Sequence, residues 1–416
     1  MKTKILALCL LLTLLGRALP AADESIDFNK ARQLAERSKR GETLTPAEEA
    51  YITRAKAEHK RQRATDNPAP AADVGDIDKA KAQAIQQRRQ KGEELSAEDK
   101  AYLRSAKVAQ RASAPAQPRW TERLTPLTEL GTAKYKGEDG GLYGGGKNEP
   151  PKIHLEAALK VVAKVQPLDA VGKPSKDGKI GLISVGMSNT TQEYSLFKPL
   201  ADADPAKSPH VVIVDGAQGG RAAIHWVDPQ SPLWKTIDDR LKTAGLSVRQ
   251  IQVAWMKQAT ANPAKDGDFP QHAKVLQENL VKGLANLKEK FPNLRLVYLS
   301  SRIYAGYAKT PLSPEPYVYE EAFSVRWLIQ DQIAGKPELN YDAAKGEVKS
   351  PLLLWGPYLW ADGETPRKAD GLIYKREDVR DDDGTHPSDT GRQKVADQLL
   401  KFLKRDATAK LWFTKQ

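Results

Sequence analysis

The 416-residue sequence predicts an α/β protein in which a parallel sheet with helices on both faces follows two small helical hairpins. Two observations support this prediction. Beyond residue 120, short apolar runs alternate with amphipathic stretches, and the runs are apolar almost throughout, as in strands buried on both faces. Ahead of that residue, an internal repeat carries the signals of helix ends and is bordered by Pro/Ala-rich segments.

Residues 1–22 have the pattern of a secretory signal peptide. Two lysines precede an apolar run over 5–15, which is too short for a lasting membrane span, and small residues follow it. We expect cleavage near Ala21 or Ala22 and a secreted or periplasmic mature protein. Because Cys9 is the only cysteine and would leave with the signal, the mature chain would have no disulfide and no thiol nucleophile.

Two helical hairpins are predicted at 23–65 and 76–111, because residues 26–57 and 77–108 within them match at an interval of 51 residues. In each copy, a glycine suits the left-handed position that ends the first helix. The stretch TPAE at 45–48 has the pattern of a capping box with proline at the first helical position. The Pro/Ala-rich segments 66–75 and 112–119 are predicted to be linkers.

The hairpins carry no pattern of catalytic or metal-binding residues. Their charged side chains fall on helix faces that we expect to be solvated. We therefore interpret them either as a plain structural extension or as a spacer that docks to a partner in the cell envelope.

Residues 120–416 form the predicted α/β domain. Its candidate strands are 179–186, 210–216, 247–256, 294–301 and 351–356. Its candidate helices are 233–245, 272–291, 318–335 and 388–405, where apolar residues recur at helical spacing. Parallel sheets bind ligands at the carboxyl ends of their strands, so the residues that follow each strand are the candidates for function.

The net charge of +12 does not predict a nucleic-acid partner, because the excess of Lys and Arg is spread along the chain. Beyond the N-terminus, no window is apolar enough to span a bilayer. The histidines lack metal-ligand spacing and no nucleotide-binding glycine motif is complete, so no metal or cofactor is expected.

Ser188 directly follows the first predicted strand, in the stretch GMSN at 186–189. One interpretation is that its hydroxyl caps the next helix or turn. The other is that it acts as a nucleophile at the mouth of the sheet. The chain has no G-x-S-x-G elbow, which argues against the common α/β-hydrolase arrangement.

Glycines and polar residues follow the second and third strands. The loop DGAQGGR at 215–221 could present backbone N–H groups to a developing anion. A phosphate-binding loop is the rival interpretation, but the ending G-K-[ST] is absent. After the third strand, Lys257 or Gln258 could donate to an oxyanion, or both could face solvent.

Near the C-terminus, the stretch DDDGTHPSDTG at 381–391 places Asp383 three residues before His386. The acids could simply be solvated, with Ser388 capping the next helix. Alternatively, Asp383 orients His386 as a general base, because a serine hydroxyl becomes nucleophilic when an imidazole takes its proton. With Ser188 and the glycine loop, these residues would then complete a nucleophile, an acid–base pair and an oxyanion site.

These blocks resemble the SGNH (GDSL-like) hydrolase family over roughly residues 175–405. They look most similar to secreted, uncharacterised bacterial members that share GMSNT, DGAQGG and DGTHPS. The resemblance implies a flavodoxin-like sheet in the order 2-1-3-4-5 and an ester-hydrolysing serine site. It implies Ser188 as nucleophile, His386 as base and Asp383 as its orienting partner. The oxyanion donors would be the N–H groups of Ser188 and Gly220.

Two positions depart from the family pattern. Met187 stands where the family usually has Asp, a residue that does not take part in bond breaking. The Asn of the third block, an oxyanion donor, falls near Lys257, with Gln258 next to it. Loss of one donor typically costs about 10²–10³ in rate. Either Lys257 is an unusual oxyanion donor, which we expect, or activity is reduced.

Weaker substrate-binding candidates near the strand ends are Asn189, Gln218, Arg221, Arg302 and Tyr304. The predicted function is a secreted serine esterase acting on O-acyl esters. Acetyl esters of carbohydrates are the expected substrates, because the resemblance implies such esters for secreted members. The alternative is a catalytically weak or inactive protein that binds glycan or an envelope partner, and a lipid-ester hydrolase is a third hypothesis.

Overall fold

The computed structural model describes isolated positions between residues 27 and 37 and the ranges 44–65, 78–90, 93–113 and 120–415. The predicted signal peptide at 1–22 and the predicted linker at 66–75 lie outside the described residues. The chain separates into two compact units, Met1–Ala109 and Gln110–Gln416.

The smaller unit contains the helices α2 (Pro46–Thr65), α3 (Lys79–Gln90) and α4 (Ala97–Ser113). The capping-box contacts expected at 45–48 are present. The Thr45 N–H donates to the Glu48 carboxylate at 2.8 Å, and the Glu48 N–H donates to the Thr45 hydroxyl at 3.3 Å. In the second copy, the Asp99 N–H donates to Ser96 Oγ at 3.0 Å. Helix α4 continues to Ser113, so it includes the first residues of the predicted linker at 112–119.

The two copies of the repeat also form equivalent ion pairs. Arg37 pairs with Glu48 at 2.8 Å in the first copy, and Arg88 pairs with Asp99 at 3.0 Å in the second. Since both partners are shifted by the interval of the sequence repeat, the copies share this local geometry. These side chains are partly exposed, so the ion pairs contribute little to the stability of the hairpins.

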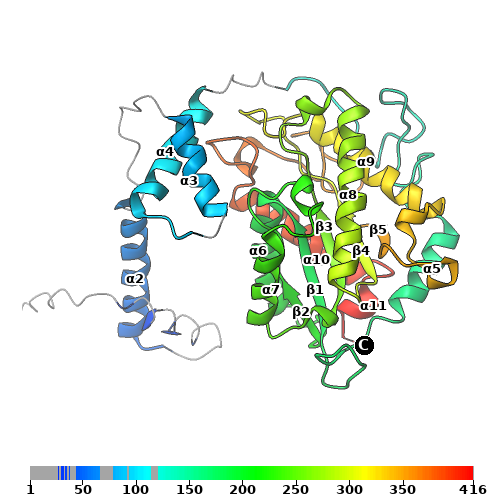
Figure 1. Cartoon of the computed structure of the whole chain (residues 1–416), viewed down its shortest axis with the longest axis horizontal. Coiled ribbons are helices and arrows are strands. Elements are labelled where there is room, and N and C mark those ends of the chain that lie inside the picture. The colour runs from blue at the N-terminus through cyan, green and yellow to red at the C-terminus, as the bar shows by residue number, and fades with distance from the viewer. Residues whose placement is uncertain are drawn as a thin grey trace, which may run out of the picture. The chain divides into compact units, whose positions relative to one another are not determined.

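The larger unit is built on a five-stranded parallel sheet in the order β2-β1-β3-β4-β5 (Figure 1). The strands are β1 (Ile180–Gly186), β2 (Val211–Val214), β3 (Ile251–Lys257), β4 (Leu296–Ser300) and β5 (Leu352–Trp355). The predicted α/β class and the strand order 2-1-3-4-5 are confirmed. Because the strands are parallel, their carboxyl ends share one edge, and the order reverses at β1, where such sheets bind ligands.

The third strand begins later than the sequence predicts. A strand was expected from residue 247, but Val248–Gln250 forms a 3-10 turn, η2, and β3 starts at Ile251. The Ser247 N–H donates to the Gln250 side-chain oxygen at 3.0 Å, and the Gln250 amide donates to the Leu168 carbonyl at 2.7 Å. These local bonds compete with the sheet ladder for this segment.

Helices connect the strands and pack around the sheet. The helices are α5 (Lys152–Val162), α6 (Ser188–Ala203), α7 (Leu233–Thr243), α8 (Gln271–Lys290), α9 (Tyr317–Ile333), α10 (Asp389–Arg405) and α11 (Lys410–Phe413). The other 3-10 turns are η1 (Ala223–Trp226), η3 (Pro263–Asp266), η4 (Pro337–Leu339), η5 (Ala343–Lys345) and η6 (Arg376–Asp378). Helix α8 packs against α9 and α6 packs against α10, and Figure 1 shows α8 in front of the sheet with α10 behind it.

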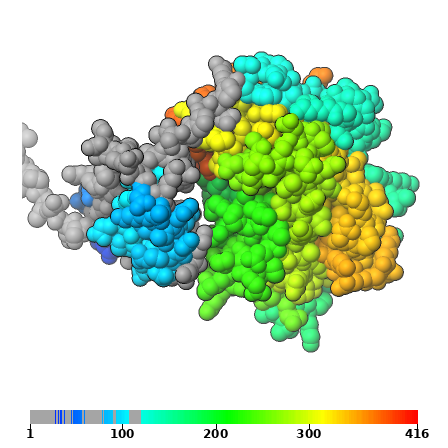
Figure 2. Space-filling model, turned by 45° about the horizontal axis from the view of Figure 1, so that its top comes forward, coloured from blue at the N-terminus to red at the C-terminus, as the bar shows by residue number. Residues whose placement is uncertain are grey.

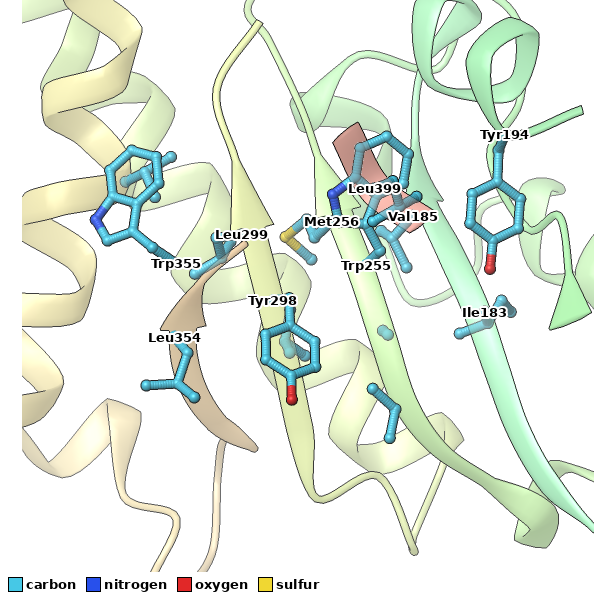
Figure 3. Packing of buried hydrophobic residues seen from close by; sticks show 14 of the residues in the cluster. Ile183, Val185, Tyr194, Trp255, Met256, Tyr298, Leu299, Leu354, Trp355 and Leu399 are labelled. Atoms are coloured by element: carbon cyan, nitrogen blue, oxygen red, sulfur yellow. The ribbon is translucent and has the colours of Figure 1, made fainter. Parts of the chain in front are cut away.

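The hydrophobic core lies on the sheet and joins it to α6 and α10 (Figure 3). Tyr194 of α6 stacks on Trp255 of β3 with ring centroids 5.8 Å apart, and Leu399 of α10 belongs to the same cluster. The Trp255 indole N–H donates to Ser300 Oγ at 3.0 Å, so this buried donor is satisfied. The packing holds α6, and therefore its first residue Ser188, firmly against the sheet.

Burial of the sheet is nearly complete. Val212 of β2 is the only residue of the five strands that is not fully buried. In the space-filling view, the segments coloured green to orange, which lie between β1 and β5 along the chain, close over one face of this unit (Figure 2). Solvent-accessible chemistry is therefore confined to the loops at the strand ends.

Candidate active site

Ser188 is the first residue of α6 and lies just beyond the carboxyl end of β1. The helix N-cap is Met187, and no side chain caps this end, so the interpretation of Ser188 as a cap is wrong. The first hydrogen bond of the helix runs from the Thr191 N–H to the Met187 carbonyl at 3.1 Å. The Ser188 N–H therefore has no acceptor within the helix and lies at the positive end of the helix dipole, where an anion is stabilised.

The turn that places Ser188 is tight. A Cβ on Gly186 would collide with the Lys257 carbonyl and the Thr190 hydroxyl, so only glycine fits there. The Thr190 hydroxyl also donates to the Lys257 carbonyl at 2.7 Å, which ties the first turn of α6 to the end of β3. This turn explains how Ser188 is presented without the G-x-S-x-G elbow.

The loop ahead of α10 is organised around the Asp383 carboxylate. Its Oδ1 accepts the backbone N–H groups of Thr385 and His386, each at 2.9 Å. Gly384 has a φ of +62°, and a Cβ there would collide with the Tyr307 carbonyl, which explains the glycine at this position. The three-residue spacing thus folds the carboxylate back onto the histidine that follows it.

Ser188 contacts His386, and His386 in turn contacts Asp383. Ser188 Oγ is 2.7 Å from His386 Nε2, and His386 Nδ1 is 2.6 Å from Asp383 Oδ2. Because a carboxylate beside Nδ1 favours the tautomer protonated there, Nε2 is left as an acceptor for the serine proton. Ser188 is half-buried and His386 is only 8% exposed, so the imidazole is more shielded from solvent than the serine.

The Asp383 carboxyl is kept ionised by its contacts. Burial alone would raise its pKa, but the hydrogen bonds from the His386 ring and N–H and from the Thr385 N–H bring the pKa well below the ordinary range of an aspartate. At neutral pH this carboxylate therefore holds its charge and can stabilise an imidazolium on His386.

We expect Asp383→Asn to lower kcat on an aryl acetate by about 10⁴-fold, because an amide that donates to Nδ1 leaves the proton on the nitrogen facing Ser188.

The lowered pKa of Asp383 also makes the stability of the folded protein depend on pH. The pair stabilises the folded protein above the unfolded-state pKa of about 3.9, and that stabilisation is lost as pH falls through the folded-state pKa. Tm measured from pH 6 to pH 2 should therefore converge for wild type and variant. A kcat loss below tenfold would contradict this role.

The glycine loop after β2 is anchored to the end of β1. The Gln218 N–H donates to the Gly186 carbonyl at 3.1 Å, and the Gly216 N–H donates to Ser184 Oγ at 3.1 Å. The Gln218 side chain is buried and donates to the Leu233 carbonyl at 3.0 Å. Gln218 was expected to contact substrate, but its amide holds the loop in place instead.

The anchored loop brings Gly219 close to the serine, and the exposed Gly220 follows it. A Cβ on Gly219 would lie 4.0 Å from Ser188 Cβ, and Gly220 is exposed with a φ of +77°. Among the described residues, no hydrogen bond uses the N–H of either glycine, so both can donate to an anion. Arg221 follows, half-buried, and its guanidinium pairs with none of the described residues, so it stays a substrate-binding candidate.

Lys257 has a different role from the one expected. Its Nζ lies 2.5 and 2.7 Å from the two carboxylate oxygens of Glu193, and both side chains are completely buried. Burial raises the pKa of Glu193 and lowers that of Lys257, while each partner's charge opposes the shift. The prediction of Lys257 as an oxyanion donor is therefore corrected, because the buried ammonium is bound to the carboxylate of Glu193 on α6.

Gln258, the other candidate of the third block, retains its hydrogen-bonding capacity. Its side chain is buried, and neither amide atom has a hydrogen-bond partner among the described residues. It borders a cavity of ≈ 10 Å³ together with Trp226 and Asn279. Its amide is therefore not committed to another group of the described residues, and Gln258 stays an oxyanion candidate.

Asn189 and Arg302 hold the loop that carries His386. The Asn189 amide donates to the Thr385 carbonyl at 3.0 Å, and the Arg302 guanidinium donates to the same oxygen at 3.3 Å. Both side chains are at most 3% exposed, which excludes the substrate contact that was predicted for them. The carbonyl that precedes His386 is thus pinned from α6 and from the end of β4. Tyr304 lines an open cleft next to this loop.

Two buried glutamates lie near Arg302 and face it from α9 and the segment before it. Burial raises the pKa of Glu321 to about 8 and that of Glu315 to about 7, although the Arg302 charge lowers both. Glu321 accepts the Thr260 N–H at 2.7 Å, and its other carboxylate oxygen has no hydrogen-bond partner. The folded state therefore binds protons here that the unfolded chain would release.

Glu321→Gln should raise the thermal stability at pH 8.5 and change it little at pH 5. A carboxyl whose pKa is raised by folding favours the folded state below its unfolded-state pKa of about 4.3, and this contribution declines as pH rises through about 8. Glutamine keeps the acceptor for the Thr260 N–H without ionising. The exposed Glu156→Gln is the matched control, and an equal pH dependence of Tm in both variants would contradict the prediction.

The contributions of Glu193, Thr385 and Gly219 to the site were not predicted. Glu193 lies on α6 and looks like a solvated acid in the sequence, but it is completely buried. One signal was present: Lys257 ends an apolar strand, and a lysine buried there needs an anionic partner. Nothing in the sequence identifies which acid supplies it.

In the described ranges, no helix has the length and apolar character needed to cross a membrane. Those same residues contain no group of three or more His, Cys, Asp or Glu side chains that could hold a metal ion.

No family model and no curated protein matches the sequence. Among solved structures, a candidate acylhydrolase from Bacteroides fragilis is 12% identical, with 64% of this chain and 100% of that chain covered and a TM-score of 0.33. A protein from Arabidopsis thaliana is 15% identical (53% and 66% covered, TM-score 0.27). The salicylyl-acyltransferase of a tetracycline biosynthetic pathway is 16% identical (54% of each chain, TM-score 0.29). At these values the likenesses carry no argument about the site.

Proposed function

We propose that the protein is a secreted serine esterase that hydrolyses O-acyl esters, with acetyl esters of carbohydrates as its substrate class. The observation that supports this best is the contact in series of Ser188, His386 and Asp383. A general base within hydrogen-bond reach of a serine, itself oriented by a carboxylate, is the arrangement that activates a hydroxyl for acyl transfer.

The reaction would run in two halves. Ser188 Oγ attacks the ester carbonyl carbon while His386 Nε2 takes the hydroxyl proton, and the carbonyl oxygen becomes an oxyanion. The N–H groups of Ser188, Gly219 and Gly220 supply donors for that charge. Collapse of the tetrahedral species expels the alcohol, which takes the proton from His386, and leaves the acyl group on Ser188.

Water then completes the second half by the same steps. His386 takes a proton from the water, the resulting hydroxide attacks the acyl carbon, and Ser188 leaves with the proton returned from His386. The products are the alcohol and the carboxylic acid. No other group is needed to balance the reaction.

The test is labelling of the purified protein by a fluorophosphonate probe, together with release of acetate from p-nitrophenyl acetate and from an acetylated xylo-oligosaccharide. We expect labelling of wild type and none of Ser188→Ala. The control is Ser195→Ala, an exposed serine on the same helix, which should label like wild type. Equal labelling of Ser188→Ala, or no acetate from either ester, would reject the proposal and favour a binding protein.

A further inference from the structure

A cleft of ≈ 410 Å³ opens on the larger unit, and none of the residues assigned to bond breaking lines it. Its lining side chains are one threonine, three aromatics and three charged residues: Thr121, Trp120, Tyr304, Tyr307, Glu122, Arg123 and Glu364. Leu, Ile, Val, Met and Phe side chains are absent from its lining. Such a mixture of aromatic faces and polar groups suits a ligand that has both apolar and hydroxylated surfaces.

The aromatic wall of the cleft is rigid. The Tyr304 and Tyr307 rings meet edge to face, with centroids 5.4 Å apart. Glycines leave room for the Tyr304 ring, because a Cβ on Gly306 would collide with it and one on Gly363 would lie 3.3 Å from it. The Tyr307 hydroxyl donates to the Tyr374 carbonyl at 3.1 Å. A preformed surface of this kind loses little conformational entropy when a ligand stacks on it.

The charges at the cleft are arranged unequally. Glu122 and Glu364 are exposed, and neither forms an ion pair or hydrogen bond with another described residue. Arg123, in contrast, donates to Asp362 at 3.3 Å and to the Thr365 hydroxyl at 2.6 Å. Two carboxylates therefore remain as acceptors for hydroxyl groups, while the single cation of the lining is already paired.

The wall of the cleft also borders the loop that carries His386. The Tyr307 carbonyl packs against Gly384, and the Lys309 N–H donates to the Asp383 carbonyl at 2.8 Å. The segment 304–309 thus separates the cleft from the loop that carries His386. A ligand in the cleft would lie one chain segment away from the proposed ester site.

We propose that this cleft binds carbohydrate, with a sugar ring stacked on Trp120 and the tyrosines and its hydroxyls donating to Glu122 and Glu364. A fatty acyl chain is disfavoured because the lining has no aliphatic side chain, and a phosphate is disfavoured because two carboxylates face one paired arginine. That the bound carbohydrate is the alcohol part of the ester substrate rests on the proposed function. The binding of carbohydrate to the cleft does not depend on it.

The experiment uses the full chain carrying Ser188→Ala, which cannot turn over an ester, and three neutral probes: xylotetraose, cellotetraose and mannotetraose. Affinity is measured by calorimetric titration and ligand-observed NMR. At least one probe should bind. Adding Trp120→Ala should weaken binding about tenfold, while Trp120→Phe, which keeps an aromatic face, should stay within about threefold. Glu364→Gln should weaken it by a smaller factor, and the exposed Ile153→Ala should not change it.

Three results would overturn the inference: no binding of any probe, unchanged affinity in both Trp120→Ala and Glu364→Gln, or tighter binding of choline, an organic cation, than of every sugar. Each variant's Tm identifies misfolding, and Glu364→Gln tests the cleft if Trp120→Ala does not fold. Ester hydrolysis by wild type is measured separately. Hydrolysis without sugar binding rejects only this inference, and sugar binding without hydrolysis supports it while rejecting the proposed esterase.

Discussion

Ser188→Ala is expected to reduce kcat/KM on p-nitrophenyl acetate by at least about 10⁴-fold, and His386→Ala by a similar factor. The reason is that the hydroxyl and the imidazole, 2.7 Å apart, act as one unit. Without the nucleophile the base has no proton to take, and without the base the hydroxyl is a weak nucleophile at neutral pH.

The double variant gives the sharper test. Because the two residues act together, Ser188→Ala with His386→Ala should lose little more activity than either single change. Independent roles would instead multiply the two losses. Single-turnover rates of ester hydrolysis, measured for all three variants with Ser195→Ala as the control, decide between these outcomes. More than a tenth of wild-type activity in Ser188→Ala would rule out the serine mechanism.

Lys257→Met should be the most destabilising single change near the site, lowering the free energy of unfolding by about 3–5 kcal/mol. The substitution leaves Glu193 of α6 buried without its counter-charge, and both side chains are completely inaccessible to solvent. Urea unfolding with an unchanged m-value would measure the loss. Activity measured well below the unfolding midpoint should fall because α6 carries Ser188.

Two further variants show whether the lost charge pair is the cause. Combining Lys257→Met with Glu193→Leu should recover most of the stability, since two apolar side chains can replace a buried ion pair at little cost. Lys235→Met breaks an exposed pair with Asp239 on α7 and should have no measurable effect. If the double variant is as unstable as Lys257→Met, packing rather than charge explains the loss.

The sequence predicted the sheet because each strand is a short apolar run with helical stretches between, a pattern that can be recognised within a short window of the chain. The order β2-β1-β3-β4-β5 came from the resemblance to a family and was confirmed. Helix α6 was missed. Its apolar residues lack a strong helical period and Pro199 lies within it, so its formation depends on Tyr194 and Phe197 packing against the sheet and α10.

Local sequence patterns were sufficient to identify candidate site residues that lie within one short stretch or directly after a strand. Asp383 and His386 belong to one loop, and Ser188 follows a strand directly, so strand ends and spacing identified all three. Their mutual contact follows from parallel strands ending at one edge. The distance of 2.7 Å between Ser188 and His386 required the folded chain, because these residues lie 198 positions apart.

The pairing of charges between distant parts of the chain could not be predicted from the sequence. A lysine, an arginine and several acids at strand ends look available to substrate when read along the chain. Folding buries Lys257 against Glu193, 64 positions away, and turns Arg302 onto the Thr385 carbonyl, because charges removed from water must find partners wherever the packing places them. The strands and the proposed set of Ser188, His386 and Asp383 could thus be predicted from residue patterns, whereas the partners of buried charges depended on which distant segments the core brought together.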